Sequence, residues 1–250
     1  MNALITGVTS GFGKAIAFRL AKLGYHIIIT GRREERLAEV ADQIRKAYPI
    51  EVYTLCFDVR NNEACMAAIN SIPAHLRPID LLINNAGLAA GASPFNDSDL
   101  ADFEQMMDTN VKGLLYITKL IVPEMIGQEK GHIINISSIA GIEVYPGGSV
   151  YCASKHAVNA ITKGLRIDLV KHGIKVSSVS PGMAETEFSI VRYHGDEEKA
   201  KAVYNGLVPL NAEDIADTVE FIITRPAHVS INDIQLNPAQ QANTYISHRK

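Results

Sequence analysis

A length of 250 residues fits one large domain or two small ones, and an apolar fraction of 47% is ample for a buried core. A formal net charge of −3, with 24 scattered lysines and arginines, excludes the concentrated positive field that gathers nucleic acid. Three cysteines without paired or metal-ligand spacing favour a reducing compartment and no metal site, and no apolar run is long enough for a membrane helix. Because an apolar strand begins right after Met1 and leaves no room for a signal peptide, we expect a cytoplasmic protein.

Short apolar runs alternate along the chain with amphipathic stretches that are long enough for helices. Strands are predicted at Ala3–Thr6, His26–Thr30, Val52–Phe57, Leu81–Asn84, Ile133–Ser137, Lys175–Ser180 and Ile231–Leu236. Helices are predicted at Phe12–Leu23, Glu34–Ala47 and Asn61–Ile72, and Leu100–Ile126 has room for two helices or one broken helix. Strands that are apolar on both faces and separated by helices indicate a doubly wound, Rossmann-type α/β sheet of about seven parallel strands. Without repeats or Gly/Ser linkers, residues 1–250 are expected to form one domain.

The first predicted strand is followed by the turn Thr6-Gly-Val-Thr-Ser-Gly-Phe-Gly13, which opens a helix. Its glycines allow a tight turn and close approach to a pyrophosphate, which the N–H groups of a helix N-terminus attract. The spacing is GxxxGxG rather than the usual GxGxxG, and glycines can also end a strand for packing reasons alone. The position between strand and helix favours a dinucleotide site with contacts from Gly7, Thr9, Ser10, Gly11, Phe12 and Gly13.

The second predicted strand ends in Thr30-Gly31-Arg32-Arg33 without an acidic residue at its tip. In dinucleotide-binding folds an acidic residue here accepts from the ribose 2′-OH, whereas arginine accommodates a 2′-phosphate. Two adjacent guanidinium groups suit a phosphate, so this pair predicts NADP rather than NAD. The alternative is that Arg32 and Arg33 only pair with Glu34 and Glu35 on a solvated helix start.

Polar and small residues also follow the third and fourth strands. Asp58 and Val59 could border an adenine, and Asn85, Ala86 and Gly87 would let the backbone lie against a ribose. Each signal alone is weak, because Asp at a strand end is commonly a helix cap and Asn-Gly clusters are usually turns. Together they lie at the carboxyl ends of successive strands, where doubly wound sheets bind ligands.

The segment from His132 to Lys155 carries the candidate catalytic groups. Ser138 ends a strand, and a Gly/Pro-rich loop leads into a helix with Tyr151 and Lys155 four residues apart, on one helical face. Tyr-x-x-x-Lys is frequent by chance, and a helical tyrosine is more often a core or interface residue. Its conjunction with the glycine-rich turn in one parallel-sheet pattern favours a proton-transfer site.

These motifs, in this order and spacing, resemble the short-chain dehydrogenase/reductase family over essentially the whole chain. The motifs are TGVTSGFG, NNAG, Asn110, Ser138, Tyr151-Cys-Ala-Ser-Lys155 and Pro181-Gly182. Further similarity in TGRREERL, FDVRN, GHIINI, EFSIVR and residues 226–232 resembles the branch of NADP-dependent 3-hydroxy acid dehydrogenases acting on serine, allo-threonine and related compounds.

The resemblance implies roles for four residues. Tyr151 would be the general acid in carbonyl reduction and the base in alcohol oxidation, and Lys155 would lower the phenol pKa from near 10 and bind the nicotinamide ribose. Ser138 would hydrogen-bond the substrate oxygen as negative charge develops on it. Asn110 would hold a water in the proton relay to Lys155. Pro181 and Gly182 are expected beside the nicotinamide, and Thr186 is expected to contact the cofactor.

The polar stretch 184–206 is predicted to lie over the nicotinamide as a lid. Within it, Arg192 is the candidate for binding a substrate carboxylate, because arginine grips that group with two parallel hydrogen bonds. A surface ion pair of Arg192 with Asp196 or Glu197 is the alternative. Glu143, in the loop after Ser138, could receive a substrate amino group, disfavour a simple carboxylate or face solvent.

The sequence therefore predicts an oxidoreductase that transfers hydride between NADP(H) and a small 3-hydroxy acid such as serine, allo-threonine or 3-hydroxyisobutyrate. The alternatives are an NADPH-dependent reductase of another carbonyl (a ketone, a pterin side chain or an oxoacyl thioester) and a non-catalytic NADP-binding regulator. The resemblance also implies a homotetramer packed through Leu100–Ile126 and Val150–Lys171, and the charge and hydropathy patterns predict no nucleic-acid or membrane partner. The tail at 238–250 is polar and is expected to reach a neighbouring subunit.

Overall fold

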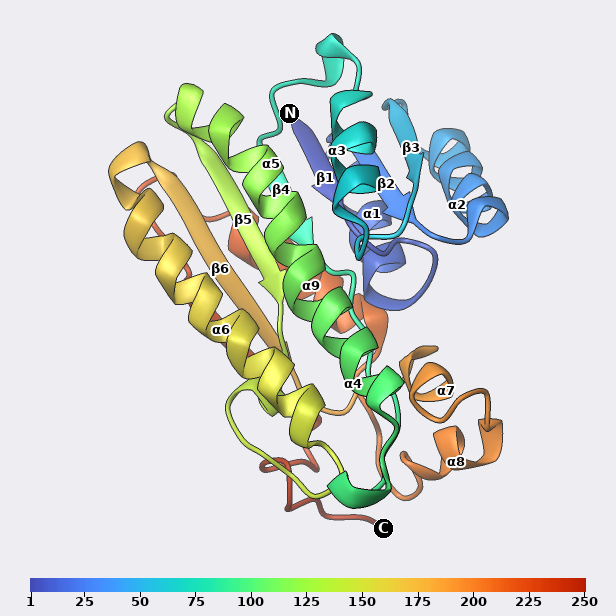
Figure 1. Ribbon diagram of the computed structural model, residues 1–250. Coiled ribbons are helices and arrows are strands. Elements are labelled where there is room, and N and C mark those ends of the chain that lie inside the picture. The colour runs from blue at the N-terminus through green and yellow to red at the C-terminus, as the bar shows by residue number, and fades with distance from the viewer.

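Seven parallel strands form one sheet in the computed structural model, which describes residues 1–250. They are β1 (Asn2–Ile5), β2 (His26–Gly31), β3 (Val52–Cys56), β4 (Leu81–Asn84), β5 (Gly131–Ile136), β6 (Ile174–Pro181) and β7 (Asp233–Leu236). Their order is β3-β2-β1-β4-β5-β6-β7, and every neighbouring pair is parallel. The chain starts in the middle of the sheet, runs outward to β3, and then returns to the other side of β1 (Figure 1). The predicted doubly wound sheet is confirmed, with its switch point between β1 and β4.

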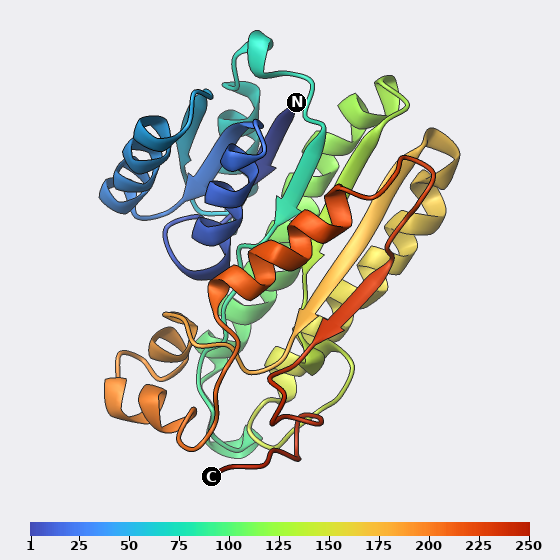
Figure 2. The ribbon, with the colours of Figure 1, turned by 180° about the vertical axis from the view of Figure 1, so that it is seen from behind.

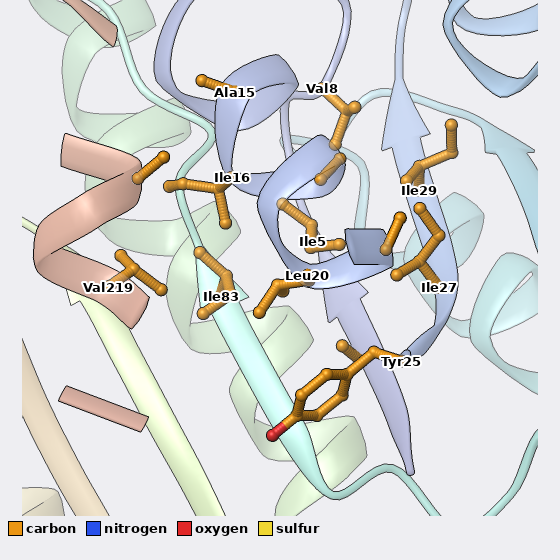
Figure 3. Packing of buried hydrophobic residues seen from close by; sticks show 14 of the residues in the cluster. Ile5, Val8, Ala15, Ile16, Leu20, Tyr25, Ile27, Ile29, Ile83 and Val219 are labelled. Atoms are coloured by element: carbon orange, nitrogen blue, oxygen red, sulfur yellow. The ribbon is translucent and has the colours of Figure 1, made fainter. Parts of the chain in front are cut away.

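Helices cover both faces of this sheet, as Figures 1 and 2 show from opposite sides. The helices α1 (Gly11–Lys22), α2 (Glu34–Ala47) and α9 (Ala212–Ile223) pack on one face, and α3 (Asn62–Asn70), α5 (Leu114–Gly127) and α6 (Ser149–Leu169) pack on the other. Alternate strand residues separate the two cores: Ile27 and Ile29 face α1, whereas Ile28 faces the α3–α5 side. Figure 3 shows Ile16 and Leu20 of α1 packed against the strands. Apolar strands buried on both faces therefore produce this layered fold.

The predicted helix over Leu100–Ile126 is broken into α4 (Leu100–Met107) and α5, joined by a π-helical turn at Asp108–Gly113. The other predicted helices match within two residues at each end, and the side chain of Asn61 caps α3 by accepting from the Ala64 N–H. Single-turn π-helical segments are rare in proteins, and those that occur are often found at functional sites. This one contains Asn110.

The predicted lid and tail both lie at the end of the molecule toward which the strands point (Figures 1 and 2). The lid carries two short helices, α7 (Phe188–Arg192) and α8 (Glu197–Ala202). A small third core lies there, in which Met106 and Tyr151 are buried and Phe188 packs against them. No helix combines the length and the apolar character that crossing a membrane requires. The carboxyl ends of the strands are thus enclosed by segments far apart in sequence.

Candidate active site

Tyr151 and Lys155 project from one face of α6 into the region where β5 ends, and both are buried. The Lys155 ammonium donates to the carbonyl of Ile136 at 2.9 Å and lies 6.0 Å from the centre of the Tyr151 ring. Ser138 follows β5, and its hydroxyl accepts from the Ala140 N–H at 3.1 Å and donates to the Pro181 carbonyl at 3.4 Å. The structure thus brings a hydroxyl, a phenol and an ammonium together.

Burial controls the proton affinities of Tyr151 and Lys155. It lowers the pKa of Lys155 from 10.5 to about 8, because a buried ammonium loses its hydration. It raises the pKa of Tyr151, and the nearby Tyr145 raises it further, whereas a hydrogen bond from Ser138 and the charge of Arg192 lower it. The pKa of Tyr151 is therefore raised rather than lowered as expected, because desolvation of the phenolate outweighs the favourable interactions.

Asn110 ties the π-helical turn to two neighbouring elements. Its side-chain amide donates to the Leu88 carbonyl at 2.8 Å and to the Ser154 hydroxyl at 3.0 Å, and its oxygen accepts from the Leu88 N–H at 2.8 Å. Both N–H groups are used, so only the second lone pair of the amide oxygen is left for a water. Asn110 therefore fixes the loop after β4 against the catalytic helix, and its predicted role in a water relay stays a prediction.

A cavity of about 390 Å³ runs along the carboxyl ends of β1 to β5 and reaches Tyr151 and Lys155. Most of the predicted cofactor contacts line it: Gly7, Thr9, Ser10, Gly11, Phe12, Arg32, Arg33, Asp58, Val59, Asn85, Ala86, Gly87 and Thr186. Three do not. Pro181 and Gly182 line a second, adjoining cavity, and Gly13 packs inside the turn, where an added Cβ would lie 2.3 Å from the Gly7 carbonyl oxygen. The role of Gly13 is therefore close packing.

The donor groups and the shape of this cavity fit a dinucleotide. Gly7 has a φ of +72°, and an added Cβ would lie 2.9 Å from the Ala86 Cα, so only glycine lets the turn pack this closely against the loop after β4. The side-chain oxygens of Ser137 and Thr109 are buried in its wall and have no protein partner. Buried hydroxyls without a partner are costly, and a polar ligand would satisfy them. The sequence reasoning missed both, because a serine beside Ser138 and a threonine beside Asn110 carry no signal of their own.

The arginines after β2 are held by partners other than those considered from the sequence. Neither Arg32 nor Arg33 pairs with Glu34 or Glu35. Arg32 lies 3.5 Å from Asp58. Burial alone would raise the pKa of Asp58, but the hydrogen bonds from Arg60 and the charge of Arg32 outweigh burial and lower it. Arg33 crosses the glycine-rich turn and donates to Thr9, Ser10 and the lid residue Glu187. Both guanidinium groups line the cavity, where a 2′-phosphate would need them.

A second cavity of about 220 Å³ adjoins the first at Tyr151 and contains the candidate substrate groups. Ser138, Tyr145 and Arg192 line it together with Thr244 of the tail. Arg192 donates to the Gly91 carbonyl at 3.3 Å and to the Tyr145 hydroxyl at 3.2 Å, and it has no carboxylate partner. The possible surface partners are engaged elsewhere: Asp196 pairs with Lys199, and Glu197 with Lys201. An arginine without an acidic partner in the wall of a cavity is suited to an anionic ligand.

Glu143 does not line either cavity, which corrects its assignment as a substrate-binding residue. Its carboxylate accepts from the backbone N–H of Thr244 at 2.9 Å and from the Thr244 hydroxyl at 2.8 Å. These bonds lower the pKa of Glu143. The expectation that the tail reaches a neighbouring subunit is thus corrected: the tail returns to the substrate cavity of its own chain and is fastened there by Glu143.

Comparison with known proteins matches residues 1–196 to the short chain dehydrogenase family model. Sulfoacetaldehyde reductase 2 of Chromohalobacter salexigens is 45% identical over 240 residues, covering 96% of this chain and 94% of the relative. The NADP-dependent 3-hydroxy acid dehydrogenase YdfG of Salmonella typhi is 44% identical over 243 residues, covering 97% and 96%. A solved structure of serine dehydrogenase in its closed form, complexed with NADP⁺, aligns over 100% of both chains with a TM-score of 0.94 at 42% identity.

Proposed function

Because the chain belongs to the short-chain dehydrogenase family, we propose that it transfers hydride between NADP(H) and a small 3-hydroxy acid such as serine, allo-threonine or 3-hydroxyisobutyrate. It is an NADP-dependent oxidoreductase that acts on CH–OH groups. The proposal thus concerns the substrate. The observation that carries it is Arg192, which lines the cavity beside Tyr151 and has no acidic partner.

Bound NADP⁺ supplies a hydride acceptor at C4 of its nicotinamide. The glycine-rich turn and the arginines after β2 would hold it, and the buried hydroxyls of Ser137 and Thr109 would satisfy polar groups along its length. The balanced reaction converts the hydroxy acid and NADP⁺ into the oxo acid, NADPH and one proton. Tyr151 lies where the two cavities meet, which supports placing the reacting carbon there.

The proton is assigned to the Tyr151 hydroxyl. Since burial raises its pKa, Tyr151 is protonated at neutral pH and ready to donate to a carbonyl oxygen during reduction. Oxidation needs the phenolate instead, which the hydroxyl of Ser138 and the charge of Arg192 favour. With its pKa near 8, Lys155 is largely charged at neutral pH. Because oxidation releases one proton, reduction is favoured near pH 7 and oxidation in alkaline solution.

A second candidate substrate class is a small sulfonate with an aldehyde or alcohol group. One relative is named for sulfoacetaldehyde, which bears a sulfonate, and its 45% identity is as high as that of any relative described above. A sulfonate and a carboxylate can each offer two oxygens to the paired N–H groups of a guanidinium, so Arg192 is compatible with either. Steady-state kinetics of serine, 3-hydroxyisobutyrate and 2-hydroxyethanesulfonate with NADP⁺ separate these classes, and a panel of ketones, pterins and oxoacyl thioesters tests the remaining carbonyl substrates. Turnover of none of them would favour the non-catalytic regulator.

Replacing Arg192 with methionine tests the anion site. We expect KM for the preferred acid to rise by about 10- to 100-fold, the effect of losing a charge-assisted hydrogen bond, with KM for NADP nearly unchanged. Arg225→Met is the matched control, because that guanidinium stacks on Phe221 in an exposed position. An unchanged KM for acids in Arg192→Met would refute the carboxylate-binding role.

We also propose a homotetramer in a reducing compartment such as the cytoplasm. Large apolar side chains are exposed on the helices that the family resemblance assigns to subunit contacts: Leu100 and Leu115 on α4 and α5, and Ile167 and Val170 at the end of α6. A free thiol at exposed Cys56 suits a reducing environment. Light scattering during size-exclusion chromatography gives the mass directly, and a monomer would contradict the tetramer.

A further inference from the structure

Glu187, the residue that precedes lid helix α7, carries a carboxylate held by two arginines of a different region. Its two oxygens accept from Arg33 at 2.8 Å and from Arg36, in the first turn of α2, at 2.6 Å. Arg33 also donates to the hydroxyls of Thr9 and Ser10 in the glycine-rich turn. The turn, the start of α2 and the lid therefore meet around one negative charge.

This arrangement has the properties of an anion-binding site. Two guanidinium groups and two neighbouring hydroxyls converge, and Glu187 and Arg33 both line the larger cavity. Burial alone would raise the pKa of Glu187, but the bonds from Arg33 and Arg36 outweigh it and lower the pKa. Carboxylate and phosphate oxygens are the two acceptors that match a guanidinium fork. The Glu187 carboxylate accordingly occupies the kind of site that a phosphate requires.

The bonds around Glu187 are exchangeable. The side chains of Arg33, Arg36 and Glu187 are 42%, 49% and 40% exposed, so water screens their ion pairs and limits their strength. A phosphate with up to two negative charges attracts the same guanidinium groups more strongly than a carboxylate with one. Arg32 takes no part in these bonds, because its acidic neighbour is Asp58, which lies 3.5 Å from its guanidinium and also binds Arg60.

We propose that Glu187 is an internal anion that competes with the 2′-phosphate of NADP(H) for Arg33 and Arg36. Cofactor binding exchanges the carboxylate for the phosphate, and Arg36 becomes a phosphate-binding residue in addition to Arg33. NAD(H), which lacks the 2′-phosphate, leaves the Glu187 pairs intact. Glu187 thus makes the lid respond to the feature that distinguishes the two cofactors.

Replacement of the Glu187 carboxylate by the 2′-phosphate also affects the substrate site, because α7 connects the two. Phe188, next to Glu187, packs edge-on against Tyr151 with ring centres 5.6 Å apart, and Arg192 at the other end of α7 lines the substrate cavity. Release of the Glu187 carboxylate removes the link between α7 and the start of α2, since Arg33 and Arg36 are its only ion-pair partners. The lid helix is then free to adjust around cofactor and substrate.

The test uses adenosine 2′,5′-bisphosphate, which carries the 2′-phosphate, and adenosine 5′-monophosphate, which does not. Isothermal titration compares the full-length protein with Glu187→Gln and with the control Glu185→Gln, an exposed lid carboxylate without an arginine partner. We expect Glu187→Gln to bind the bisphosphate about 2- to 5-fold more tightly, the range for removing a screened ion-pair competitor, and the monophosphate equally well. Tighter binding of both nucleotides, or weaker binding of the bisphosphate, would overturn the proposal. Neither titration requires a substrate, so the result tests the role of Glu187 independently of the proposed activity.

Two further measurements address Arg36 and the lid. In the Glu187→Gln background, Arg36→Gln should weaken binding of the bisphosphate but not of the monophosphate, and an unchanged bisphosphate affinity would remove Arg36 from the phosphate site. Hydrogen exchange of the amides at 188–192 should increase when the bisphosphate binds to wild type, and should already be raised in Glu187→Gln. Exchange that is identical in the two proteins would show that Glu187 does not restrain the lid.

Discussion

The two cavities that meet at Tyr151 are enclosed by different kinds of structural element. The cofactor cavity lies against strand ends and a glycine-rich turn, and partly buried hydrogen bonds fix its backbone: Asn85 donates from its side chain to the carbonyls of Thr6 and Gly7. The substrate cavity is enclosed by a loop, a lid and a tail that meet through side chains, such as Arg192 with Tyr145 and Glu143 with Thr244. Rigid sheet edges suit a ligand common to many enzymes, whereas side-chain contacts between loops can change from one relative to the next.

Replacing Tyr151 with phenylalanine should have the largest effect, because it removes the proton at the point where the cavities meet. We expect kcat to fall by about 10²- to 10⁴-fold, the usual range for losing a general acid or base. NADPH binding, measured by fluorescence titration, should persist, since the wall of the cofactor cavity is otherwise intact. Activity close to that of wild type would show that the proton comes from another group.

Gly13→Ala tests whether the glycine-rich turn beside the cofactor cavity is rigid. An added Cβ would lie 2.3 Å from the Gly7 carbonyl oxygen and 2.5 Å from the Asn85 amide nitrogen, which bonds the same carbonyl. Overpacking of this kind costs about 1–3 kcal/mol of unfolding free energy, and we expect weaker NADPH binding as well. Gly127→Ala is the control, because nothing lies within 4 Å of its added Cβ. Urea denaturation of both variants measures the difference, and equal stability would mean that the turn can relax.

The same contrast explains which features were predictable from the sequence. Apolar periodicity, the glycine-rich turn and the Tyr151–Lys155 spacing are local signals, so they predicted the sheet and most of the cofactor cavity. The roles of Glu143 and Glu187 depend on contacts that join residues far apart along the chain, such as Glu143 with Thr244 and Arg33 with Glu187, and that of Ser137 depends on burial without a partner. The direction of the Tyr151 pKa shift likewise depends on burial, which no residue spacing reveals.

Lys155, which is buried near the boundary between the two cavities, should make the unfolding free energy depend on pH. Its pKa is about 8 in the folded protein and near 10.5 when exposed, so between these values the unfolded chain binds more protons than the folded one. Its contribution to the unfolding free energy should therefore become more favourable as the pH rises from 8 to 10. Urea denaturation of wild type and Lys155→Met at several pH values measures this difference. A wild-type slope equal to or below that of the variant would contradict a buried ammonium.

Glu143→Gln should have the smallest effect and should act on the substrate side alone. The amide keeps one acceptor oxygen but loses the charge that strengthens the bonds from the Thr244 N–H and hydroxyl, so the tail is held less firmly against the cavity that Thr244 lines. We expect KM for the acid to rise by no more than about fivefold, with kcat and NADPH affinity unchanged. Glu129→Gln, remote from both cavities, is the control. A loss of NADPH affinity in Glu143→Gln would show that the tail supports the cofactor cavity too, and the division between a rigid cofactor side and an adjustable substrate side would not hold.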